Sequence, residues 1–130
     1  MKNNVVKLVK YLYYLSLVAL LILYLFPGSL IGFFLYGDPE KQPILISNHI
    51  GTSINHLIFF FYLSILSFII NIKYKDLIYS FPFLFCISIL LELLHIIVPN
   101  RAFEFMDLFA NSAGVITAFL IFNLSKKIKK

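Results

Sequence analysis

Apolar residues along the chain fall into four long runs, and short polar segments rich in proline, glycine and lysine separate them. The runs cover residues 5–26, 54–72, 77–98 and 108–124. A helix needs about 20 apolar residues to cross the hydrocarbon core of a bilayer, and each run is close to that length. The pattern therefore predicts an all-α fold with four membrane-spanning helices.

The segments between the runs predict how these helices are joined. The first segment is about 25 residues long, starts with the helix-breaking pair Pro27 and Gly28, and is long enough to fold over a site. The second is so short that the second and third helices must form an antiparallel hairpin. Pro82 falls in the first turns of the third helix, where proline is tolerated, and Pro99 ends that helix. We expect one domain over residues 1–130, an integral membrane four-helix bundle with a long first loop.

The start of the chain has two interpretations. Lys2, Lys7 and Lys10 lie at the start of the first apolar run, a pattern that a secretory signal peptide shares. No small-residue cleavage site follows, and bulky tyrosines and leucines fill the run. We expect the first helix to be retained as an anchor, with cleavage as the open alternative.

The composition excludes a water-soluble enzyme. Hydrophobic residues make up 61% of the 130 positions and charged residues 13%, whereas soluble domains have roughly 45–50% and 25%. The polar remainder is split into short pieces, which leaves no room for a second, soluble domain. The single cysteine, Cys86, lies within an apolar run and is interpreted as a small core residue.

The distribution of lysine and arginine predicts the orientation. Nine of the eleven lie at the start of the first run, in the 73–76 turn and after the fourth run, and the other two are Lys41 and Arg101. The positive-inside rule then places both termini and the 73–76 turn in the cytoplasm, and the long first loop and the 99–107 loop outside. Lysines at helix ends are explained by snorkelling and by anionic lipid, so we expect no nucleic-acid partner.

Polar residues inside the runs are the candidates for function, because ionisable groups in a span are costly. The spacing of Glu92 and His95 puts both on one face of the third helix, and Asp107 and Asn111 share a face at the start of the fourth. With the predicted topology, six candidates gather at the outer ends of the helices: His56, Glu92, His95, Arg101, Asp107 and Asn111. Arg101 is close enough in sequence to reach Glu104 or Asp107, or to fold back over Glu92.

Each candidate also has a purely structural interpretation. Asp107 fits an N-cap of the fourth helix, and Asn111 fits a hydrogen-bonding contact between helices beside the small Gly114. Glu92 with His95 fits a pair whose charges satisfy each other. Two histidines also have structural interpretations, His56 as an interfacial residue and His49 as a loop residue. The tyrosines of the first run, Tyr24 among them, fit an interfacial belt and helix packing.

The segment from residue 92 to residue 114 resembles the signature of the VanZ-like membrane protein family. That signature has an acidic residue near the end of one span, a Pro-x-Arg loop, an Asp-x-x-x-Asn pair opening the next span, and a following glycine. The matching residues are Glu92, Pro99, Arg101, Asp107, Asn111 and Gly114. Asn55 and His56 resemble the family's histidine at the head of an aromatic-rich span, so the likeness covers the second to fourth runs and the first only by position.

Two positions depart from the family pattern. His95 stands where the family commonly has glutamine, and Thr52 and Ser53 stand where an Asp-Lys pair commonly precedes the histidine. The resemblance implies a multi-pass protein of the bacterial cytoplasmic (inner) membrane. The family's founding member is similar to a glycopeptide (teicoplanin) resistance accessory of Gram-positive bacteria, and the resemblance implies no defined activity.

Three functions stay open at this point. The first is binding of a membrane lipid or lipid-linked cell-wall molecule, with Arg101 engaging phosphate through two parallel hydrogen bonds above the other polar candidates. The second is an intramembrane hydrolase or transferase, for which Glu92, His56 and Asp107 are the catalytic candidates. The third is a structural, partner-binding protein, with a homo-oligomer or another membrane partner left open.

A metal-dependent form of the enzyme would combine Glu92 and His95, three residues apart on a helix, with His56 or Asp107. Such a set is weak evidence beside a four-cysteine site. We therefore assign no metal and no cofactor from the sequence.

Overall fold

The computed structural model describes residues 3–41 and 51–128, with only the backbone of residues 51 and 52. Every regular element in these residues is helical, and no strand occurs among them, so the all-α prediction is confirmed. The elements are α1 (Asn3–Leu25), α2 (Leu30–Tyr36), α3 (Gly51–Tyr74), the 3-10 turn η1 (Leu77–Tyr79), α4 (Phe81–Leu94) and α5 (Phe105–Ile128). His49 lies outside the described residues.

Three helices are long and apolar enough to cross a bilayer. They are α1, the Ser53–Tyr74 part of α3, and α5, with 23, 22 and 24 residues and mean hydropathies of 2.0, 1.9 and 1.7. Large apolar side chains such as Leu15 and Phe109 are exposed on their outward faces. Contact between apolar surface and water is unfavourable, so exposed apolar surface on this scale indicates contact with lipid. The chain is therefore a membrane protein.

The third predicted helix is shorter than expected. The sequence pattern predicts one helix over residues 77–98, but the structure has η1, then the 14-residue α4, then turns from His95 onward. Ser80 starts α4 afresh, because its side chain accepts a hydrogen bond from the backbone N–H of Phe83 (3.4 Å). After Leu94, the backbone N–H of His95 bonds to Glu92 in a tighter i to i−3 pattern. The result is an α-helix of about 21 Å, below the roughly 30 Å of the hydrocarbon core.

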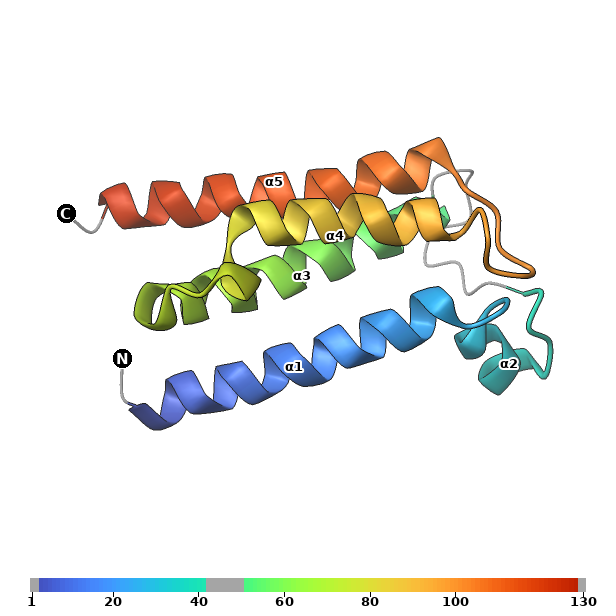
Figure 1. Cartoon of the computed structure of the whole chain (residues 1–130), viewed down its shortest axis with the longest axis horizontal. Coiled ribbons are helices and arrows are strands. Elements are labelled where there is room, and N and C mark those ends of the chain that lie inside the picture. The colour runs from blue at the N-terminus through green and yellow to red at the C-terminus, as the bar shows by residue number, and fades with distance from the viewer. Residues whose placement is uncertain (1–2, 42–50, 129–130) are drawn as a thin grey trace.

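The helices lie side by side with their ends aligned in two groups (Figure 1). The start of α1, the end of α5 and the turn between the antiparallel α3 and α4 lie at one end of the molecule. The end of α1, the start of α3, the end of α4 and the start of α5 lie at the other, which also carries α2. We call this second end the α2 end.

Helices α3 and α5 approach each other closely at Gly114. A Cβ atom built there would lie 2.5 Å from the carbonyl oxygen of Leu57 and 2.9 Å from the backbone nitrogen of Phe61, closer than real contacts allow. Glycine therefore lets the two backbones meet, as small residues do between membrane helices. The contact sets the first turns of α3 against the first turns of α5, near the α2 end.

One expectation about a smaller feature is wrong, and one helix was not predicted. Cys86 is exposed rather than a core residue, because it points away from the face of α4 that buries Leu84 and Ser88. The first loop also contains a helix, α2. Ser29 caps its start by accepting from the Gly32 N–H (2.9 Å), and Gly37 ends it with a left-handed φ of 69°.

Candidate functional site

The α2 end brings together all six candidate residues of the sequence analysis. Asn111 of α5 lies at their centre and is fully buried. Its Nδ2 donates to the Ser88 carbonyl (3.3 Å) and to Glu92 Oε2 (3.5 Å) of α4. Its Oδ1 accepts from the Tyr24 hydroxyl (2.8 Å) and lies 3.2 Å from His56 Nδ1. One amide therefore links α5 to α1, α3 and α4.

Asp107 binds across to α3 rather than capping its own helix. Its backbone lies inside α5, which begins two residues earlier at Phe105, so the N-cap interpretation is wrong. Its Oδ1 accepts from the Ser53 hydroxyl (2.5 Å), and its Oδ2 lies 3.6 Å from His56 Nε2. The side chain is nearly buried, and its contacts tie the starts of α3 and α5 together.

Glu92 and His95 form a pair at the end of α4. His95 Nδ1 lies 3.3 Å from Glu92 Oε1, which also accepts from the backbone N–H of Glu104 (3.2 Å). The His95 ring stacks on Tyr24, with centroids 5.1 Å apart. Both side chains are buried, yet His95 Nε2 has no hydrogen-bond partner in the described part of the chain. Glu92 Oε1 therefore has two contacts, whereas one imidazole nitrogen of His95 has none among the described residues.

Arg101 binds the end of α1 instead of an acidic side chain. Its Nη2 donates to the Leu23 carbonyl (2.7 Å), and its Nε donates to the Phe26 carbonyl (3.4 Å). None of the ion pairs between described residues involves Arg101, so the expected contacts with Glu104, Asp107 or Glu92 do not form. Carbonyls at a helix C-terminus carry partial negative charge, which attracts the guanidinium. Burial lowers the pKa of Arg101 from its usual value, but arginine stays protonated.

Tyr24 and Ser53 belong to the site but were not among the candidates that the sequence pattern predicted. Tyr24 is 8% exposed, and its hydroxyl lies 2.6 Å from His56 Nδ1 while donating to Asn111, so it is not an interfacial belt residue. Its position in the last turn of the first apolar run, level with the six candidates, was the available signal. In the sequence, Ser53 stood out only as a departure from the family pattern. Its position at the start of α3, near the level of Asp107, was the signal that its hydroxyl could bind the Asp107 carboxylate.

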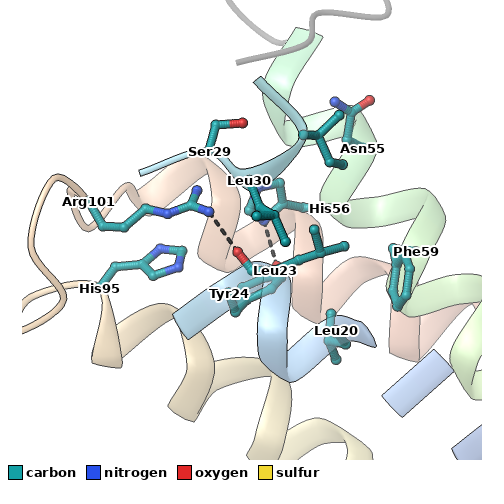
Figure 2. Close-up of a pocket in the computed structure, with 11 residues that line it drawn as sticks. Leu20, Leu23, Tyr24, Ser29, Leu30, Asn55, His56, Phe59, His95 and Arg101 are labelled. Atoms are coloured by element: carbon teal, nitrogen blue, oxygen red, sulfur yellow. Dashed lines mark hydrogen bonds between the residues drawn. The ribbon is translucent and has the colours of Figure 1, made fainter. Parts of the chain in front are cut away.

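Two pockets open beside this cluster, and His56, His95 and Arg101 line both. The polar lining residues of the first pocket, about 150 Å³, include Ser29 and Asn55 in addition to those three. Its apolar lining residues include Leu20, Leu23, Leu30 and Phe59 (Figure 2), together with Ile31. The second, about 290 Å³, is more polar and is completed by Asn100, Ala102, Glu104 and Asp107. Arg101 therefore lines both the more apolar first pocket and the more polar second pocket.

The family model for VanZ/LLP1 matches residues 9–126 of the sequence. The chain belongs to the VanZ/LLP1 family. No curated protein and no solved structure matches it. The match includes α1, which the resemblance noted from the sequence covered only by position. The VanZ/LLP1 region therefore contains every helix that contributes to the site, and Tyr24 with it.

The VanZ/LLP1 site also contains a group of residues that could hold a metal ion. His56, Glu92 and Asp107 each offer one donor atom, and these atoms all lie within 4.8 Å of one another. The three come from α3, α4 and α5, and two of them are buried. His95, which the sequence analysis paired with Glu92 for this purpose, is not in the group.

Proposed function

We propose that this protein binds an anionic amphiphile, a membrane lipid or a lipid-linked envelope molecule, at the α2 end. The observation that carries the proposal is the mixed lining of the first pocket, where Arg101 and two histidines occur together with leucines and a phenylalanine. A charged headgroup with an apolar chain matches both kinds of residue in such a lining, since small-molecule sites combine an apolar wall with a few placed polar groups.

The polar lining residues suit a phosphate headgroup. Arginine has five N–H donors in a planar fork, and the Leu23 and Phe26 carbonyls account for contacts from only two of its nitrogens. His95 Nε2, buried and unmet, lines the same pocket as Arg101. Phosphate oxygens accept strongly from a guanidinium, and they accept from His95 Nε2 when that nitrogen carries a proton in addition to Nδ1. A bound headgroup would therefore satisfy a nitrogen that the protein itself leaves without a partner.

The proposed topology puts this site in the outer leaflet of a bacterial cytoplasmic membrane. The positive-inside rule favours both termini in the cytoplasm, and the start of α1, the end of α5 and the α3–α4 turn share one end of the molecule (Figure 1). We propose that α4 is the fourth span of a four-helix bundle over residues 1–130. Its 14 residues would cross with the help of η1 and the turn after His95.

Native mass spectrometry of the detergent-purified protein tests the proposal. The probes are phosphatidylglycerol, a polyprenyl phosphate and zwitterionic phosphatidylcholine. We expect the wild type to retain the first two, and Arg101→Ala to weaken their retention by about tenfold, because a hydrogen bond to a charged group contributes about 1.5–3 kcal/mol. Arg101→Lys should fall between, since lysine keeps the charge but not the fork.

Two variants guard against trivial explanations. Lys41→Ala removes an exposed cation from outside the pocket lining and should bind like the wild type. His95→Phe keeps a ring to stack on Tyr24 but removes both nitrogens, so it should weaken binding without unfolding α1. Equal retention of phosphatidylcholine and the anionic lipids, or unchanged binding by Arg101→Ala, would contradict the proposal.

A second candidate function, an intramembrane hydrolase or transferase, is favoured by the position of His56. Its Nε2 lies beside Asp107 and lines the second pocket, where a general base could act on a headgroup held by Arg101. Incubating the protein with a polyprenyl diphosphate and following phosphate release tests this. His56→Gln and Glu92→Gln should abolish the release, and full activity in both would exclude the catalytic role.

A further inference from the structure

The cluster at the α2 end buries more negative charge than its neighbours neutralise. Glu92 is fully buried and Asp107 is 7% exposed. Arg101 directs its hydrogen bonds to backbone carbonyls, and in the described residues only histidines come within ion-pair distance of the two carboxylates. A buried carboxylate is costly unless a positive group compensates it. The cluster therefore calls for further positive charge.

The hydrogen bonds around His56 determine which nitrogen carries its proton. The single hydroxyl proton of Tyr24 goes to Asn111 Oδ1, which can only accept. The Tyr24 oxygen, 2.6 Å from His56 Nδ1, must then accept from that nitrogen. Nδ1 is therefore the protonated nitrogen, and a neutral His56 directs the lone pair of Nε2 toward the Asp107 carboxylate.

The distance between these two electron-rich atoms suits an ion between them. His56 Nε2 and Asp107 Oδ2 are 3.6 Å apart, which is longer than an N–H···O hydrogen bond of about 2.7–3.2 Å. Two ligands of one tetrahedral metal, with bonds of about 2.1 Å, lie about 3.4 Å apart. The pair is thus spaced as metal ligands are.

Glu92 supplies a third ligand, and other groups orient all three. The donor atoms of His56, Glu92 and Asp107 lie within 4.8 Å of one another. Ser53 binds the far oxygen of Asp107, and His95 and the Glu104 N–H bind Glu92 Oε1. Such outer contacts are characteristic of metal sites, where they fix the direction of each ligand. The second pocket, lined by His56 and Asp107, leaves a side open for water or substrate.

We infer that His56, Glu92 and Asp107 form a binding site for one divalent cation of the Zn²⁺ class. One imidazole and two carboxylates are ligands that zinc takes, and three protein ligands with an open position are typical of its catalytic sites. The inference goes beyond the proposed lipid binding and is tested without lipid.

The experiment uses the full chain, purified in detergent, stripped with a chelator and titrated with Zn²⁺ alone by calorimetry. We expect one ion per chain, and a loss of affinity of about tenfold or more in His56→Gln and Asp107→Asn, since even outer-shell changes cost 10–100-fold. Glu104→Gln is the matched control, because it removes an exposed carboxylate from the mouth of the same pocket. It should bind Zn²⁺ like the wild type.

Two further measurements separate loss of the site from loss of the fold. Ser53→Ala leaves the three ligands in place and should weaken Zn²⁺ binding through Asp107 alone. Co²⁺ added to the wild type should give visible bands of a low-symmetry site, and Zn²⁺ should displace them. The inference is overturned if the wild type takes up no Zn²⁺. It is equally overturned if Glu104→Gln loses as much affinity as Asp107→Asn.

Discussion

At the level of single residues, the site is organised by two neutral side chains rather than by its charged ones. Asn111 uses its amide across three neighbouring helices, and Tyr24 bridges Asn111 and His56 through one hydroxyl. These bonds orient the imidazole of His56, and the ring of Tyr24 stacks on that of His95. The charged residues around them therefore depend on Tyr24 for their geometry.

Tyr24→Phe tests this dependence. The substitution keeps the ring but removes the hydroxyl that joins His56 Nδ1 to Asn111 Oδ1, leaving these two atoms only their longer contact of 3.2 Å with each other. The net loss of a hydrogen bond costs about 0.5–1.5 kcal/mol. We expect the midpoint of denaturant unfolding in detergent to fall accordingly. Tyr11→Phe, which alters a 74% exposed tyrosine of the same helix, should leave it unchanged. Equal stability of the two variants would show that the Tyr24 hydroxyl contributes little.

At the level of helices, the close contact of α3 and α5 decides where the site forms. Gly114 allows the backbones to meet one turn beyond Asn111, and this sets His56 of α3 opposite Asp107 of α5. Helix α4 ends at Leu94, so Glu92 lies in its last turn. The turns that follow bring His95 against Tyr24. The lengths and contacts of the helices thus position the site residues.

Gly114→Ala tests the contact, and the two relevant effects have opposite signs. Alanine is favoured over glycine in a helix by about 1 kcal/mol, but its methyl group would overlap the Leu57 carbonyl at 2.5 Å, and overpacking costs about 1–3 kcal/mol. We expect net destabilisation of thermal unfolding in detergent. Thr117→Ala, on the exposed side of α5, is the control and should change little. A more stable Gly114→Ala would mean that the helices separate without cost.

At the level of the whole molecule, the proposed topology decides which compartment reaches the site. Both proposed outer segments, α2 and the turns after α4, lie at the α2 end, and the lysine-rich ends lie opposite (Figure 1). A ligand from the outer leaflet would then enter beside Arg101 without crossing the bilayer. The opposite orientation would open the same pockets to the cytoplasm.

Cysteine labelling in intact bacterial cells distinguishes the two orientations. In a Cys86→Ala background, an impermeant maleimide should label Tyr36→Cys in α2, whose side chain is exposed. Lys127→Cys, near the end of α5, should react only after the cells are permeabilised. The reverse labelling pattern would place the site in the inner leaflet and exclude an outer-leaflet ligand.

Much of this arrangement follows from the sequence alone. The apolar runs determine that the fold is all-α, because a run of that length can satisfy its backbone in lipid only as a helix. The order of those runs determines that Glu92 and His95, at the end of one helix, meet Asp107 and Asn111, at the start of the next. No information beyond spacing and chain direction is needed to bring these residues to one level.

The tertiary structure decided the remaining features, because they depend on distances between helices. Arg101 had acidic residues within reach, but packing put the carbonyls at the end of α1 closer. Asp107 turns to Ser53 and His56 because α3 crosses it there, which no local pattern of α5 encodes. The role of Tyr24 also depends on helix packing, because its hydrogen-bond partners, His56 and Asn111, lie on other helices. The sequence does not distinguish it from the other tyrosines of the first apolar run.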